Sequence, residues 1–188
     1  MLAMDARSVV QIVAVVAFTA AALTMDLKTR KIPNLLTVPA FVLGLIFQVW
    51  FGGLDGLWSA LAGFGLGFGM LLVLWLIGGG GAGDVKLMGA LGAWLGGRLT
   101  IYVLIFSTIF VALGSVLFLM VEWTMRGWAF TRRRYLGRFN EDRAREEGID
   151  RQTAIRKWRE RRRIMPYALP VGLATWLILA WKVFHHSA

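Results

Sequence analysis

The sequence lacks cysteine entirely and has only two histidines, both among its last four residues. Without cysteine there can be no disulfide, no thiolate zinc site and no cysteine nucleophile. Two histidines at one end leave little for a histidine metal site or a serine–histidine relay. Acidic residues are also scarce, because 11 Asp and Glu stand against 21 Lys and Arg, for a net charge of +10. The few carboxylates are therefore the main candidates for chemistry.

Apolar residues, by contrast, are abundant, at 57% of the chain with 9 Trp and 12 Phe. A soluble domain of 188 residues buries only part of its apolar surface, so this excess must face something other than water. High hydropathy together with high charge excludes both an ordinary soluble globule and a disordered tail. The composition indicates an integral membrane protein in which apolar and charged stretches are separated along the chain.

Apolar runs predict six membrane spans. They cover residues 8–25, 35–51, 57–77, 85–97, 99–121 and 167–184. The run 85–97 has only 13 residues and contains Lys86, so its length alone also fits a re-entrant segment. If it crosses, the positive-inside rule puts 18 of the 21 basic residues, including those of the loop 122–165, in the cytoplasm. We therefore predict an all-α polytopic fold, a single membrane-embedded domain with six spans and both termini outside.

Two aspartates stand out from the other acidic residues. Outside the stretch 126–163 the acids are Asp5, Asp26, Asp55, Asp84 and Glu122. Asp26 closes the first predicted span and Asp84 opens the fourth, so six spans bring both to the cytoplasmic boundary. Two carboxylates at one depth can approach until they share a proton, and such a pair can activate water while it protonates a substrate carbonyl.

Each aspartate also has a non-catalytic interpretation. Asp84 lies at a predicted helix N-terminus, where a carboxylate caps unpaired N–H groups and meets a favourable dipole. Asp26 lies at a helix C-terminus, where Lys28, Arg30 or Lys31 could neutralise it. The glycine-rich run 78–83 before Asp84 gives the backbone unusual freedom and leaves room for another chain, although it also fits a flexible linker.

Other glycines predict close helix packing, because small residues four apart let backbones approach. They are Gly63, Gly65, Gly67 and Gly69 in the third span, and Gly92 and Gly96 in the fourth.

The loop between the last two spans is strongly basic, with 14 Lys and Arg against 6 Asp and Glu over 126–163. Asn140 and Asp150 are predicted helix starts, and Ile155 and Trp158 share a face three residues apart. These features favour an interfacial segment on anionic lipid, with a solvated charged loop as the alternative. We expect no nucleic-acid partner, because no reading module is present.

Three local patterns together resemble the type IV prepilin peptidases, the intramembrane aspartic endopeptidases of the GxGD type. Asp26 is followed after five residues by Ile32-Pro33-Asn34, similar to the first aspartate of that family and its IPN element. Gly81-Ala82-Gly83-Asp84 continues into Val85-Lys86-Leu87, similar to the GxGD element with its lysine. Pro166-Tyr167-Ala168-Leu169-Pro170 resembles the start of the last helix in the family.

The resemblance implies that Asp26 and Asp84 are the catalytic pair. It places the motif residues Gly81, Gly83, Lys86, Ile32, Pro33 and Asn34 near the substrate. The implied substrates are prepilin-like precursors, whose short basic leader is cut at the cytoplasmic face of the bacterial inner membrane. No metal ion or organic cofactor is implied. Longer members carry paired CxxC motifs and also N-methylate the mature pilin, so we expect peptidase activity without methylation, as in short members serving tight-adherence-type pili.

Two other functions compete with this interpretation. Membrane-edge acids and broken helices also mark a small proton-coupled transporter or channel, although such a protein should carry an ionisable residue near the middle of a span. A non-catalytic pilus-assembly membrane subunit would use its glycine-rich faces to gather partners, and its aspartates would be replaceable.

Overall fold

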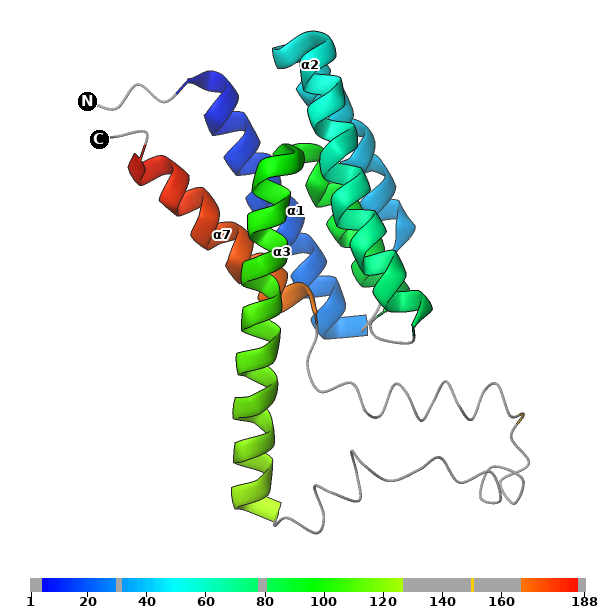
Figure 1. Ribbon diagram of the computed structural model, residues 1–188, viewed down its shortest axis with the longest axis vertical. Coiled ribbons are helices and arrows are strands. Elements are labelled where there is room, and N and C mark those ends of the chain that lie inside the picture. Colours follow the sequence, from blue (N-terminus) through cyan, green and yellow to red (C-terminus); the bar gives the residue numbers. More distant parts are fainter. Residues whose placement is uncertain (1–4, 30–31, 78–80, 127–149, 151–166, 186–188) are drawn as a thin grey trace. The chain divides into compact units, whose positions relative to one another are not determined.

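A computed structural model of the chain describes residues 5–29, 32–77, 81–126, 150 and 167–185. Within these ranges the secondary structure is entirely helical, with α1 at Ala6–Thr29, α2 at Asn34–Leu76, α3 at Ala82–Arg126 and α7 at Ala168–His185 (Figure 1). The first three helices are each long and apolar enough to cross a membrane, and Ala168–Phe184 of α7 is a shorter apolar helix. The predicted all-helical membrane protein is thus confirmed.

Several threonine hydroxyls inside these apolar helices donate to a carbonyl of their own helix. Thr19 donates to the Val15 carbonyl at 2.8 Å, and Thr175 donates to the Val171 carbonyl at 2.7 Å, in each case one turn back along the helix. Such back-bonding lets a polar side chain lie in a buried helix without an unpaired hydroxyl.

Two glycines break the long helices α2 and α3. Gly53 has φ 56° and ψ −137°, and Gly96 has φ 75° and ψ 173°, conformations that residues with a Cβ rarely adopt. The two parts of α2 return alongside each other, since the rings of Phe41 and Phe64 lie 4.7 Å apart (Figure 1). The described chain therefore holds the helical segments 6–29, 34–52, 54–76, 82–95, 97–126 and 168–185. Each overlaps one of the six predicted apolar spans.

Glycine packing joins the second part of α2 to the first part of α3. A Cβ on Gly63 would collide with the Gly92 carbonyl, and one on Gly67 would collide with the Met88 carbonyl. The backbones are therefore in close contact, as predicted. The same prediction is wrong for Gly65 and Gly69, which have nothing within 4 Å of an added Cβ. Residues two apart point to opposite sides of a helix, so these glycines lie away from the packed face.

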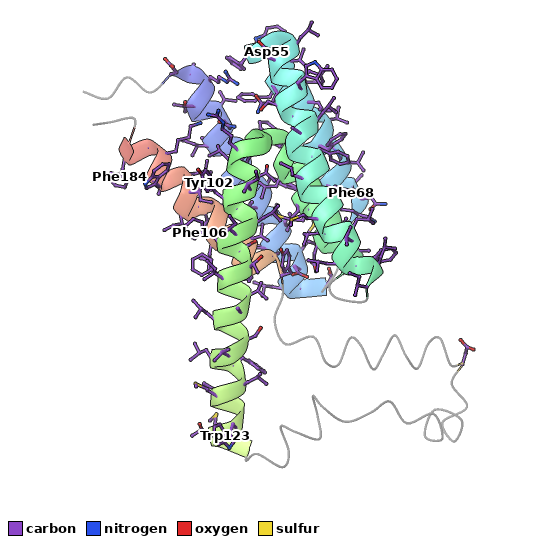
Figure 2. All side chains as sticks on the ribbon, viewed as in Figure 1. Asp55, Phe68, Tyr102, Phe106, Trp123 and Phe184 are labelled. Carbon is purple, nitrogen blue, oxygen red and sulfur yellow. The ribbon has the colours of Figure 1, made fainter. Side chains whose placement is uncertain are left out.

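The chain divides into two compact units, residues 1–110 with 166–188 and residues 111–165. In the first unit α1 packs along α7. Side chains such as Tyr102, Phe106 and Phe184 project from their helices and are exposed (Figure 2). Exposed aromatic surface of this kind suits a lipid environment.

The second unit contains the end of α3 and the basic loop. The helix continues to Arg126, five residues beyond the predicted span boundary at Val121. The predicted helix start at Asn140 and the pair Ile155 and Trp158 lie outside the described residues.

Candidate active site

Asp26 is buried near the end of α1, with 1% of its surface exposed. Its Oδ2 accepts a hydrogen bond from the backbone N–H of Ala168 at 3.3 Å. Ala168 is the first residue of α7, and the first N–H groups of a helix have no partner inside it. The carboxylate is thus held by a second helix. Lys28 is exposed and forms no ion pair with Asp26. The other two cations that could neutralise Asp26, Arg30 and Lys31, lie outside the described residues, so neutralisation by a nearby cation stays a prediction.

Asp84 is also buried, with 5% of its surface exposed, in the first turn of α3. Its Oδ2 accepts from the Gly81 N–H at 3.0 Å, while its own N–H donates to the Gly81 carbonyl at 3.0 Å. In a capping box the side chain of the third helical residue accepts a hydrogen bond from the N-cap backbone N–H, and Asp84 does this with Gly81. The helix dipole also favours a carboxylate at this position. The capping interpretation is confirmed. The cap fixes the direction of the carboxylate, so capping and a chemical role are compatible.

The Ile-Pro-Asn element and the Gly-x-Gly-Asp element meet in space. Lys86 Nζ donates to Asn34 Oδ1 at 2.7 Å across a separation of 52 residues. Buried Ile32 packs on Gly83, since its Cβ lies 3.4 Å from where a Gly83 Cβ would be. Pro33 precedes α2 in an extended conformation, with φ −73° and ψ 149°. The starts of α2 and α3 are therefore joined at the end of the first unit that carries both aspartates, here called the aspartate end.

The start of α7 reaches both aspartates. The Tyr167 hydroxyl is hydrogen-bonded to Ser107 and interacts electrostatically with Asp84. The next residue, Ala168, donates its N–H to Asp26. Two consecutive residues at the start of α7 thus lie near the two carboxylates, Ala168 bonded to Asp26 and Tyr167 within range of the charge of Asp84.

Sequence reasoning assigned no role to several residues of this end. Tyr167 and Ala168 were noted only as part of the stretch 166–170, whose two prolines resemble the start of the last helix in the family. Ser107 lies inside an apolar run, and no sequence pattern indicated a role for it. Thr37 was also missed; its hydroxyl oxygen is buried without a hydrogen-bond partner among the described residues.

The aspartate end offers carboxylate chemistry. Two buried carboxylates held by backbone N–H groups can exchange protons with a water and a carbonyl substrate. Among the described residues no three His, Cys, Asp or Glu side chains gather closely enough to hold a metal ion.

Comparison with known proteins points to one family. The family model for the type IV leader peptidase family matches residues 13–116, a range that includes both aspartates. A prepilin leader peptidase/N-methyltransferase of Xanthomonas campestris is 31% identical over 170 residues, covering 84% of this chain and 45% of the relative. Proteins with the same description from Escherichia coli K12 and Aeromonas hydrophila are 37% and 38% identical over 78 and 106 residues. These cover 38% and 50% of this chain and 35% of each relative.

The chain thus spans less than half the length of these curated relatives. No solved structure matches it significantly.

Proposed function

Because the chain belongs to the type IV leader peptidase family, we propose that it is an intramembrane aspartic endopeptidase that removes the leader from prepilin-like precursors. The observation that carries this proposal is the pair of buried aspartates, Asp26 and Asp84, at one end of the first unit, with Ala168 bonded to Asp26 and Tyr167 within range of the charge of Asp84. Aspartates are seldom fully buried, because even a hydrogen-bonded carboxylate loses hydration, so two of them at one end of a helical bundle favour a functional role.

In the proposed reaction one carboxylate is ionised and the other carries a proton, the arrangement expected when two carboxylates act on one substrate carbonyl. The ionised carboxylate takes a proton from water as the oxygen attacks the scissile carbonyl, while the protonated one donates to the carbonyl oxygen. The tetrahedral intermediate then collapses, and the amine leaves with a proton from the aspartate pair. The products are a new carboxylate on the leader and a new amine on the mature protein, and the proposal involves no metal or organic cofactor.

The residues around the pair have supporting roles in this proposal. Gly81 has no side chain next to Asp84, which leaves room for an extended substrate backbone to approach, and Gly83 lets Ile32 pack against the start of α3. Pro33 and Ile32 place the start of α2 against the start of α3. Lys86 and Asn34 are exposed and hydrogen-bonded to each other, so they can flank an incoming chain.

The proposed orientation follows the distribution of charge. If all six helical segments cross the bacterial inner membrane, both termini lie outside and the aspartate end faces the cytoplasm with 18 of the 21 basic residues. A precursor whose basic leader remains in the cytoplasm would then present its scissile bond at the level of the aspartates. The basic loop would lie on anionic lipid, with no role in nucleic-acid binding.

The test is cleavage of a prepilin-like reporter by the full chain in membranes, with Asp26→Asn and Asp84→Asn compared with wild type. Asparagine keeps the size of the side chain but cannot act as an acid or base, so each variant should cut at least about 100-fold more slowly. Asp55→Asn is the matched control, since Asp55 is an exposed aspartate in the turn of α2 (Figure 2). Membrane abundance is measured for every variant.

Cleavage at the wild-type rate by either Asp26→Asn or Asp84→Asn would overturn the assignment of the pair. If wild type cut no reporter and both variants still supported pilus assembly, a non-catalytic assembly subunit would be the better interpretation.

A further inference from the structure

A second polar cluster lies in the first unit at the end opposite the aspartates. Gln11 of α1 precedes Asp26 by 15 residues, which corresponds to about 22 Å along a helix. Lys182 lies near the end of α7, far from the Ala168 N–H that holds Asp26. The cluster consists of Arg7, Gln11, Gln48, Lys182 and the backbone carbonyl of Trp94, and is here called the distal cluster.

The centre of the distal cluster is a carbonyl at a helix break. Gly96 interrupts α3 two residues after Trp94, and the last carbonyls of a helical segment need partners from elsewhere. Gln11 Nε2 donates to the Trp94 carbonyl at 2.6 Å, and Gln48 Nε2 donates to it at 3.0 Å. A carbonyl oxygen has two lone pairs, so the two amides saturate it. Both glutamines are buried, with 5% and 3% of their surfaces exposed.

The outer part of the distal cluster consists of two cations. Arg7 Nη2 donates to Gln48 Oε1 at 3.0 Å, and Lys182 Nζ donates to Gln11 Oε1 at 3.1 Å. The two neutral glutamines bond to the same carbonyl and thus hold a guanidinium and an ammonium, two like charges, in one cluster. Within the described part of the chain neither cation forms an ion pair with a carboxylate. Two like charges held together in this way are unfavourable unless an anion joins them.

We propose that the distal cluster binds a phosphate group, supplied by the headgroup of a membrane phospholipid. A guanidinium has five N–H donors and an ammonium has three, of which the described contacts use one each. Phosphate oxygens accept several such charge-assisted hydrogen bonds at once. The cluster lies where apolar helices end, which is the level of lipid headgroups in a bilayer. The saturated Trp94 carbonyl and the glutamines hold the cations in place without offering a competing anion.

This site is separate from the proposed catalytic site and does not depend on it. The competing explanation is that the hydrogen bonds only support the helix break at Gly96, in which case phosphate would make no difference to the protein.

The experiment uses the purified full chain in a phosphate-free detergent and measures the thermal unfolding midpoint as lipid is added. Dioleoyl phosphatidylglycerol is compared with dioleoyl glycerol, which has the same acyl chains but no phosphate. The phospholipid should raise the midpoint in a saturable manner, and dioleoyl glycerol should not. Arg7→Gln, alone and with Lys182→Gln, should weaken the apparent affinity about tenfold or more, because each removes a charge-assisted contact.

The matched control is Arg98→Gln with Lys28→Gln, which removes two exposed basic side chains outside the distal cluster and should leave the affinity unchanged. Arg7 is exposed, so Arg7→Gln keeps the test usable if the double variant fails to fold. Equal protection by inorganic phosphate alone would support the phosphate site but identify free phosphate as its source. Equal protection by both lipids in wild type, or equal weakening in Arg7→Gln and the control, would overturn the proposal.

Discussion

At the residue scale, the two aspartates are held in different ways. Asp84 accepts a hydrogen bond from Gly81 at the start of its own helix, so its position is fixed locally. Asp26 depends on the N–H of Ala168, which belongs to α7 and is 142 residues away in sequence. A displacement of the start of α7 would therefore change the surroundings of Asp26 while the Gly81 cap still held Asp84.

The role of the start of α7 at the aspartate end can be tested at Tyr167. Tyr167→Phe removes the hydroxyl that bonds Ser107 and interacts with Asp84. We expect cleavage of the reporter to fall about tenfold because the hydroxyl helps to position the aspartate pair, a modest share of what general acid–base catalysis supplies. The free energy of unfolding should fall by only about 1 kcal/mol, the usual net value of one hydrogen bond. The measurements are kcat/KM as a function of pH and thermal stability.

Ser107→Ala is the matched control for Tyr167→Phe, because it removes the same hydrogen bond but leaves the phenol beside Asp84. It should lose similar stability, retain more activity and keep the wild-type pH profile. If both variants lost the same activity with no change in the pH profile, Tyr167 would act through packing alone.

The sequence could predict the aspartates and their motif neighbours because those residues lie within short stretches. Asp26 and Asn34 are eight residues apart, and Gly81 and Lys86 are five. It could not predict that Tyr167 bonds Ser107, because that contact depends on how α7 packs against α3. Hydropathy assigns a single serine in an apolar run to the span and says nothing about its partner.

At the element scale, glycines determine both where the helices turn and where they touch. The sequence predicted packing at all four glycines of 63–69, because pairs of small residues four apart occur on both faces of this helix. Only the positions of neighbouring helices decide which face is used. Gly63 and Gly67 contact the backbone of α3, whereas Gly65 and Gly69 face open space.

This difference predicts opposite effects of the same substitution. Gly63→Ala would place a methyl group against the Gly92 carbonyl, and such overpacking should lower the free energy of unfolding by roughly 1–3 kcal/mol. Gly65→Ala meets nothing and replaces glycine inside a helix, so stability should stay level or rise by up to about 1 kcal/mol. Denaturant titration in detergent measures both. Equal destabilisation by the two variants would contradict the close contact between α2 and α3.

At the scale of the whole molecule, the six helical segments of the described residues each overlap one of the six apolar runs, so their order along the chain could be predicted from hydropathy. That each of them crosses a membrane stays a prediction. The two breaks could be predicted only to within a few residues, because several glycines surround each of them. The structure uses Gly53 and Gly96, the described positions with positive φ. The assignment of each end to one side of the membrane depends on the distribution of Lys and Arg alone, because the packing of the helices is the same in either orientation.

The lack of cysteine makes that orientation directly testable. Asp55→Cys and Lys28→Cys each introduce a single thiol into this chain at an exposed position, Asp55 next to the break in α2 and Lys28 near the end of α1. A membrane-impermeant maleimide applied to intact spheroplasts should label the Asp55→Cys variant and leave the Lys28→Cys variant unlabelled until the cells are lysed. Cleavage of the reporter by both variants is the control for correct folding.

The reverse labelling pattern would put the aspartates outside and contradict cutting of a leader held in the cytoplasm. Labelling of both in intact spheroplasts would mean that residues 34–52 do not separate these positions by a membrane crossing, and the six-span arrangement would be wrong.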